Sequence, residues 1–177
     1  MQDGSHGVLE IAAREGKTVK VTEVNVALLN ASGQFPENGL IYTYRTDAIT
    51  SQPNGIRLKN GAEVLRPMTV VSEDPVDVQG DFNTVNKKGV AVMSDAVSLL
   101  SNAWDDSKRA GGPLPAASNT SYNLAIVTGK VSTPDGGGNY SGGFENLPRF
   151  HENWTGKTAS IRGSFINIFD SEIAKSP

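Results

Sequence analysis

The sequence predicts an all-β fold built as a short right-handed parallel β-helix. Composition is the first observation: the 177 residues include 19 glycines and 9 prolines, and only 37% are hydrophobic. This balance favours short strands joined by turns over a helical bundle. The second observation is that short alternating apolar runs recur in the middle of the chain every 20–22 residues, a spacing typical of a solenoid.

The chain begins with a β-rich segment at residues 8–30. Within it, residues 19–26 alternate apolar and polar side chains, as a half-buried strand does. A loop is predicted at 31–39 and a further strand at 40–44. Because open strand edges invite pairing with other chains, we expect residues 8–30 and 144–169 to cap the two ends of the solenoid.

The repeat itself lies between residues 56 and 100. One series of strands comprises Ile56–Leu58, Val76–Val78 and Val97–Leu99, and a second comprises Met68–Val70 and Val90–Val92. Strands of successive coils stack about 4.8 Å apart in a parallel arrangement. Ile56, Val76 and Val97 are therefore predicted to form one inward apolar column, and Met68 and Val90 the start of another.

After residue 100 the repeat ends. Residues 104–120 and 132–143 are rich in glycine, proline and small polar residues, and they predict loop insertions. Residues 8–177 are expected to form one domain, with 1–7 as a leader or an expression remnant. An antiparallel β-sandwich explains the composition equally well and is the alternative fold, although it does not predict the 20–22-residue recurrence.

Charge and cysteine content exclude several classes of function. Sixteen basic and nineteen acidic residues give a net charge of −3, without the basic surplus expected of a protein that binds nucleic acid or an anionic membrane. The absence of cysteine excludes disulfides, thiolate metal sites and a cysteine nucleophile. No apolar run is long enough for a membrane span, and residues 1–7 lack the apolar core of a signal peptide.

Common catalytic motifs are incomplete in this sequence. Two Gly-Lys-Thr triplets, at 16–18 and 156–158, lack the earlier glycine that a phosphate-binding loop requires. The two histidines, His6 and His151, are too few for a His-only zinc site, and no Gly-x-Ser-x-Gly turn is present. The sequence therefore assigns no catalytic residue.

Carboxylates are the candidates for a metal site. The spacing of 22 residues places Glu73 over Asp95, with Asp74 beside Glu73. Stacked carboxylates can bind calcium through oxygen ligands, so Glu73, Asp74 and Asp95 are the predicted metal ligands and calcium the candidate cofactor. The simpler interpretation is that these acids face solvent or cap turns.

Aromatic residues are the candidates for ligand binding. Trp104, Tyr140 and Trp154 border or lie within predicted loops, where aromatic rings can bind sugars. In a small β protein such residues more often fill the core. A polysaccharide-cleaving site would need carboxylates and a basic residue, and Glu73, Asp95 and Arg57 are the nearest set.

Several motifs also resemble a known family. They occur in order at residues 75–83 (PVDVQGDFN), 91–104, 125–129, 140–146, 149–154 and 161–165. Together they resemble an uncharacterised C-terminal domain of bacterial envelope proteins that begin with a PilX-type, pilin-like helix. The resemblance covers about residues 65–172. It differs at His151, where the family usually has leucine, and in lacking the pilin-like helix.

The resemblance implies an extracellular or cell-surface location in a bacterium and no established catalytic residues. It suggests a non-enzymatic surface module for adhesion, pilus-associated assembly or scaffolding, with pilus proteins, envelope proteins or surface glycans as partners. The alternative is a carbohydrate-active β-helix enzyme, either a polysaccharide lyase or a hydrolase.

Overall fold

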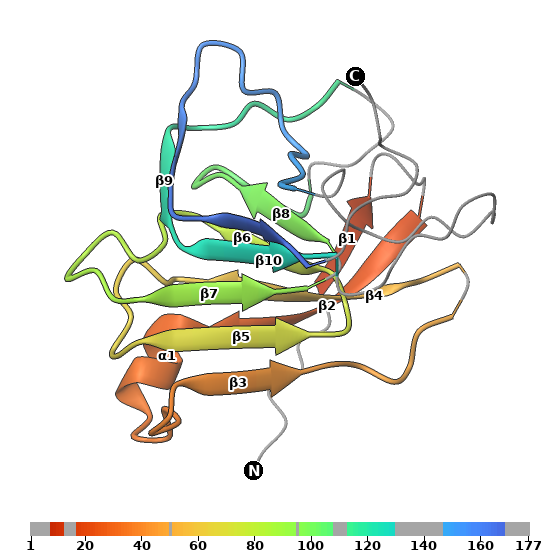
Figure 1. The fold of residues 1–177 in the computed structure, drawn as a ribbon. Helices are drawn as coiled ribbons and strands as arrows, with labels where there is room; N and C mark the ends of the chain where they lie inside the picture. The colour runs from red at the N-terminus through yellow and green to blue at the C-terminus, as the bar shows by residue number, and fades with distance from the viewer. Residues whose placement is uncertain are drawn as a thin grey trace.

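The computed structural model describes residues 8–12, 17–49, 51–94, 96–107, 113–129 and 147–168 (Figure 1). The elements follow in this order: β1 Val8–Ala12, β2 Lys17–Asn25, α1 Val26–Ala31, β3 Leu40–Thr43, β4 Asn54–Lys59, β5 Met68–Ser72, β6 Val76–Gln79, β7 Val90–Met93, β8 Val97–Leu100, β9 Thr120–Asn123, β10 Ala125–Thr128, β11 Ala159–Arg162 and β12 Phe165–Asn167.

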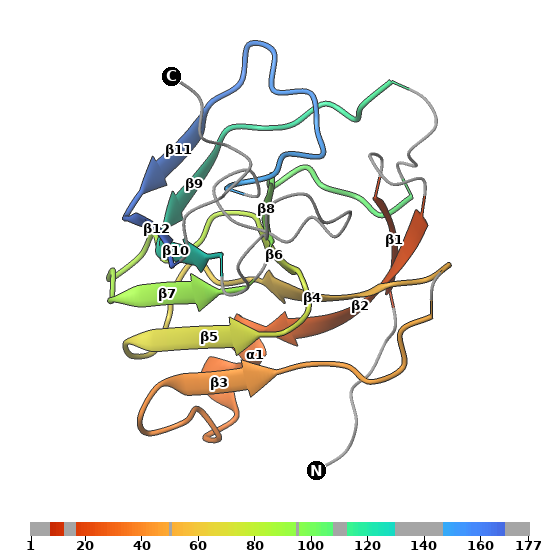
Figure 2. The same ribbon diagram turned by 45° about the vertical axis from the view of Figure 1, so that its right-hand side comes forward.

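The strands form three sheets. Sheet A has the order β1-β2-β4-β6-β8, sheet B the order β12-β10-β7-β5-β3, and sheet C the order β11-β9. All pairs are parallel except β1 with β2. From β3 to β8 the chain alternates between sheets B and A, and from β9 to β12 it alternates between sheets C and B (Figures 1 and 2).

Both predicted architectures, the all-β right-handed parallel β-helix and the antiparallel β-sandwich, are wrong. The structure is of the α/β type with little helix: three mostly parallel sheets, and helix α1 between β2 and β3. The regular repeat covers only the middle of the chain. Before it lie the antiparallel β1–β2 pair and α1, and after it the chain enters sheet C. The predominance of parallel pairing excludes the sandwich.

The two apolar columns predicted from the repeat are confirmed. Ile56 pairs with Val76 and Val76 with Val97 in sheet A, while Met68 pairs with Val90 in sheet B. These residues are buried between sheets A and B, as are the next members of the rows, Leu58, Val78, Leu99, Val70 and Val92. Each such side chain contributes about 1.5–3 kcal/mol through its burial, so the inward rows supply the core.

The predicted caps are only partly correct. At one end, Asn25 begins α1 by accepting a hydrogen bond from the Leu28 backbone N–H at 3.2 Å. Val26 of that helix and Phe35 after it pack into the core. At the other end, β11 and β12 extend sheets C and B rather than covering them. Phe165 lies in the inward row of Ile126 yet remains 47% exposed.

Gly163 makes the turn from β11 into β12 possible. A Cβ atom at this position would lie 1.8 Å from the carbonyl oxygen of Leu124, which is backbone and cannot rotate away. Replacing Gly163 by alanine should therefore lower the free energy of unfolding by on the order of 1–3 kcal/mol, as overpacking does. Chemical denaturation would measure this change.

Gly89→Ala is the matched control, because nothing lies within 4 Å of a Cβ atom at Gly89. Equal stability changes in the two variants would contradict the close approach of Gly163 to Leu124.

Candidate functional site

The outward face of sheet A carries a row of polar side chains. In-register pairing aligns Glu23 with Arg57, Arg57 with Asp77, and Asp77 with Ser98. These residues alternate with the apolar residues that point into the core. Arg57, Asp77 and Ser98 are nevertheless buried, at 1%, 7% and 5% exposure. A second layer of structure must therefore cover this face.

Residues after β8 provide part of that cover. The Arg57 guanidinium donates two hydrogen bonds to the Asp106 carboxylate, at 2.9 and 2.8 Å, and its Nη1 lies 3.5 Å from Glu23 Oε1. Trp104 donates its indole N–H to the same carboxylate at 2.9 Å. Because Trp104 is only 8% exposed, this predicted ligand-binding residue has a structural position beside the Arg57 ion pair.

Residues 147–152 cover the far end of the row. Arg149 pairs with Ser98 through backbone hydrogen bonds, its N–H donating to Val97 at 2.8 Å and its carbonyl accepting from Leu99 at 2.9 Å. His151 Nε2 lies 3.0 Å from Ser98 Oγ. The hydrogen bonds therefore fasten this segment along β8.

The Ser98–His151 pair resembles half of a hydrolytic triad, but its surroundings favour a structural role. Ser98 lies within a strand rather than on an exposed turn, and the adjoining hollow measures about 80 Å³. This volume is well below the roughly 300–1,000 Å³ of typical ligand pockets, so the hollow is a poor site for a substrate.

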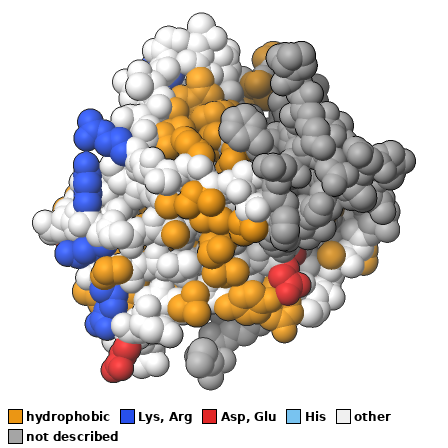
Figure 3. All heavy atoms as spheres, viewed as in Figure 1, with side chains coloured by type: hydrophobic (Ala, Val, Ile, Leu, Met, Phe, Trp, Pro, Cys, Tyr) orange, Lys and Arg blue, Asp and Glu red, His pale blue; other side chains and the backbone are white. Residues whose placement is uncertain are grey.

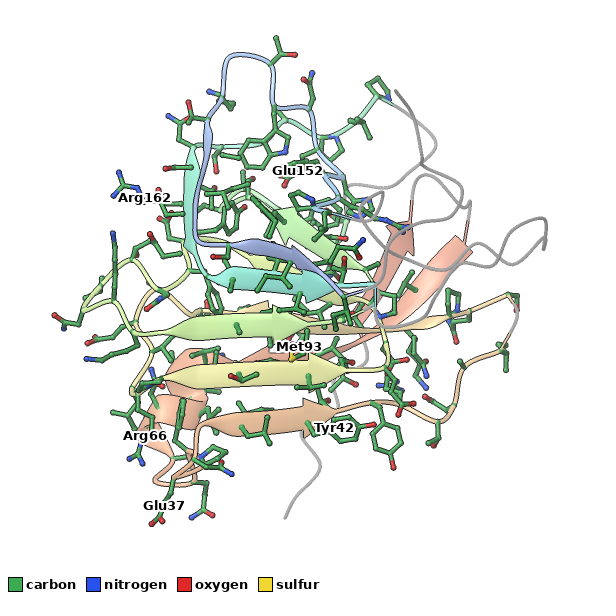
Figure 4. The ribbon with its side chains drawn as sticks, in the orientation of Figure 1. Glu37, Tyr42, Arg66, Met93, Glu152 and Arg162 are labelled. Carbon is green, nitrogen blue, oxygen red and sulfur yellow. The ribbon has the colours of Figure 1, made fainter. Side chains whose placement is uncertain are left out.

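Glu152 also attaches this segment to the strand-bearing part of the molecule. Glu152, labelled in Figure 4, is 4% exposed. Its carboxylate accepts hydrogen bonds from the Ser101 N–H and Oγ, both at 2.6 Å. Hydrogen bonds to a charged acceptor are roughly twice as strong as neutral ones. Glu152 thus holds the backbone that carries Phe150 and Trp154.

An aromatic cleft lies beside this attachment. The rings of Phe150 and Trp154 meet edge to face, with centroids 5.6 Å apart and an interplanar angle of 75°. Trp154 packs against the core, whereas Phe150 and Leu114 remain 41% and 48% exposed. The depression has a volume of about 440 Å³ and is also lined by Glu152, Asn153, Thr155 and Ala159.

The other predicted site residues do not join this cleft. Tyr140 and Asp95 lie outside the described residues. Glu73 is exposed and accepts a hydrogen bond from the Tyr42 hydroxyl at 2.5 Å, and the Asp74 carboxylate accepts one from the Arg45 N–H at 2.7 Å. Within the described ranges, no three His, Cys, Asp or Glu side chains gather as metal ligands would.

The aromatic residues that the sequence offers as candidates for binding a sugar include both Trp154 and Phe150, whereas the sequence gives no signal for Glu152 or Leu114. The spacing of Phe150 and Trp154 was visible, yet it suggests a helical turn as readily as a cleft. Leu114 comes from a segment forty residues away, joined through the pairing of Ala116 with Asn153. No local pattern in the sequence indicates that contact.

No family model, curated protein or solved structure matches the chain. The resemblance to the envelope-protein domain therefore stays a prediction. Among the residues that the structure describes, no helix combines the length and apolar character needed to cross a membrane.

Replacing Glu152 by alanine should lower the free energy of unfolding by about 2–4 kcal/mol. The substitution removes two charge-assisted hydrogen bonds and leaves the Ser101 donors buried without their acceptor. Thermal and urea unfolding would measure the loss. Asn153→Ala is the comparison because Asn153 is exposed, and an equally large loss there would contradict the special role of Glu152.

Proposed function

We propose that this chain is a non-enzymatic binding module displayed at a bacterial cell surface, and that a glycan binds in the cleft at Phe150 and Trp154. The supporting observation is the edge-to-face pair of the exposed Phe150 and the half-buried Trp154 beside an open depression of about 440 Å³. The module would act in adhesion or in pilus-associated assembly. Its surface location is part of the proposal and rests on the motif resemblance.

The chemistry of the cleft suits a sugar. Aromatic rings provide rigid apolar area for the C–H face of a pyranose, and a few polar groups orient the ligand. Asn153 and Thr155 border the rings and supply such groups. The Asn153 side-chain oxygen already accepts from the Thr155 N–H at 2.9 Å, which orients the amide at the rim.

The carbohydrate-active enzyme is less well supported. Of its three proposed residues, Arg57 is enclosed on sheet A by Glu23 and Asp106, and Glu73 is exposed after β5 of sheet B. These two side chains belong to different sheets, whereas an acid–base pair must flank one glycosidic bond.

A glycan array probed with the purified protein, with calcium and then with a chelator, would test the proposal. We expect binding to one class of polysaccharide, and Trp154→Ala should weaken it at least about tenfold, the size of effect typical of a buried aromatic contact. Titration of a soluble oligosaccharide of that class, followed by calorimetry, would give the affinity.

Tyr44→Ala is the matched control. Tyr44 is 53% exposed and also lies near a second ring, Tyr42, at 5.5 Å, but it is not part of the cleft. Equal losses in the two variants would place the ligand elsewhere. An array without binding in either condition would contradict the glycan proposal, and turnover of a bound glycan would contradict the non-enzymatic one.

A further inference from the structure

The outward face of sheet B carries an apolar row that crosses all five strands. In-register pairing aligns Tyr42 with Val71, Val71 with Met93, Met93 with Val127, and Val127 with Ile166. Beside it runs a second row, which comprises Leu40, Thr69, Ala91 and Ala125. The outward face of sheet A differs, because it carries the polar row that includes Glu23 and Arg57.

This apolar face is open to solvent at its two edge strands, where Leu40 and Tyr42 of β3 and Ile166 of β12 are 49%, 54% and 45% exposed. Val71 and Met93 are half-buried in the middle of the sheet, and Val127 of β10 is buried, at 9% exposure. Figure 3 shows the resulting apolar band across the front of the molecule. Large contiguous apolar surfaces on soluble proteins usually mark sites of interaction.

Charges of opposite sign lie at the two ends of these strands. At the N-terminal ends of the strands lie the basic residues Arg66, Lys87, Lys88 and Arg162. Figure 3 shows Lys and Arg side chains along this edge. The same end also has Glu37 and Glu63. At the opposite end, Glu73 and Asp74 follow β5 directly, while Arg45 and Asp47 follow β3 and form an ion pair with each other. Figure 4 places Arg66 and Arg162 at one side of sheet B and Tyr42 at the other.

We propose that this face binds a second copy of the chain, face to face, around a two-fold axis that lies midway between the two sheets, parallel to them, and crosses the strands at right angles. Rotation about this axis reverses strand direction and keeps strand order. Each strand then lies over its counterpart, with the basic end of one copy over the acidic end of the other. A two-fold axis along the strands would place basic end on basic end, which like-charge repulsion disfavours.

Charge complementarity selects a second copy as the occupant. Apolar rows meet in the centre, and Glu73 of each copy lies near the basic end of the other, where Lys88 precedes β7. Such an interface is isologous, because each contact occurs twice. Two sheets can pack in this way with a separation of about 10 Å.

The size of the face predicts a weak dimer. Five strands at about 4.8 Å spacing span about 19 Å, and the strands with their charged ends extend about 23 Å. The interface then covers at most about 450 Å² per copy and about 900 Å² in total, which is below the range of stable complexes. We therefore expect a dimer that forms only at high protein concentration.

Sedimentation velocity over micromolar to millimolar concentrations would test this inference. The chain should shift from monomer to dimer, and Val71→Lys should raise the dissociation constant at least about tenfold by placing two charges in the apolar centre. Leu28→Lys is the control, since Leu28 is 67% exposed on α1 rather than on sheet B. Circular dichroism of each variant would establish that it folds.

Charge reversal distinguishes the proposed axis from other arrangements. Glu73→Lys and Lys88→Glu should each weaken the dimer, and the double variant should restore it. Higher salt should weaken the wild-type dimer. A monomer at every concentration, equal effects of Val71→Lys and Leu28→Lys, or a double variant weaker than either single one would overturn the proposal.

Discussion

Parallel in-register pairing is the constraint on which the rest of this structure depends. It places one residue of each strand beside its counterpart on the next, so each row across a sheet has one direction, inward or outward. Leu58, Val78 and Leu99 form an inward row, and their neighbours Arg57, Asp77 and Ser98 form an outward one. A slip of one residue in any strand would exchange the two rows and bring charges into the core.

The two outward faces illustrate opposite consequences of this constraint. On sheet A the outward row is polar and is covered by Trp104, Asp106 and residues 147–152, so its charges require partners. Arg57 obtains them from Asp106 and Glu23, because a buried guanidinium without a carboxylate would cost several kcal/mol. On sheet B the outward row is apolar, exposed at Tyr42 and Ile166 and buried at Val127. The proposed dimer would bury that surface.

The aromatic cleft depends on the polar face beneath it. Phe150 and Trp154 lie on a segment without helix or strand of its own, held by Arg149 on β8 and by Glu152 on Ser101. Tyr122 adds a further buried bond by donating its hydroxyl to the Leu100 carbonyl at 2.7 Å, and burial raises the pKa of that phenol. Rigid support of this kind reduces the entropy lost when a ligand binds.

The sequence by itself determined the strands of the repeat and their register, because alternation and a 20–22-residue spacing are local properties of the chain. It could not determine the fold class. Helix α1 follows the Asn25 cap directly after β2, and its Val26 packs into the core, a contact with distant residues that the sequence does not indicate. The sequence could not determine the candidate site either. Trp104 and Trp154 look alike in the sequence, and tertiary contacts decide which one is enclosed. Trp104 is buried against the Arg57 ion pair, whereas Trp154 borders a cleft that Leu114 completes from a distant segment. Burial depends on contacts between residues far apart in the chain, and such contacts leave no local pattern.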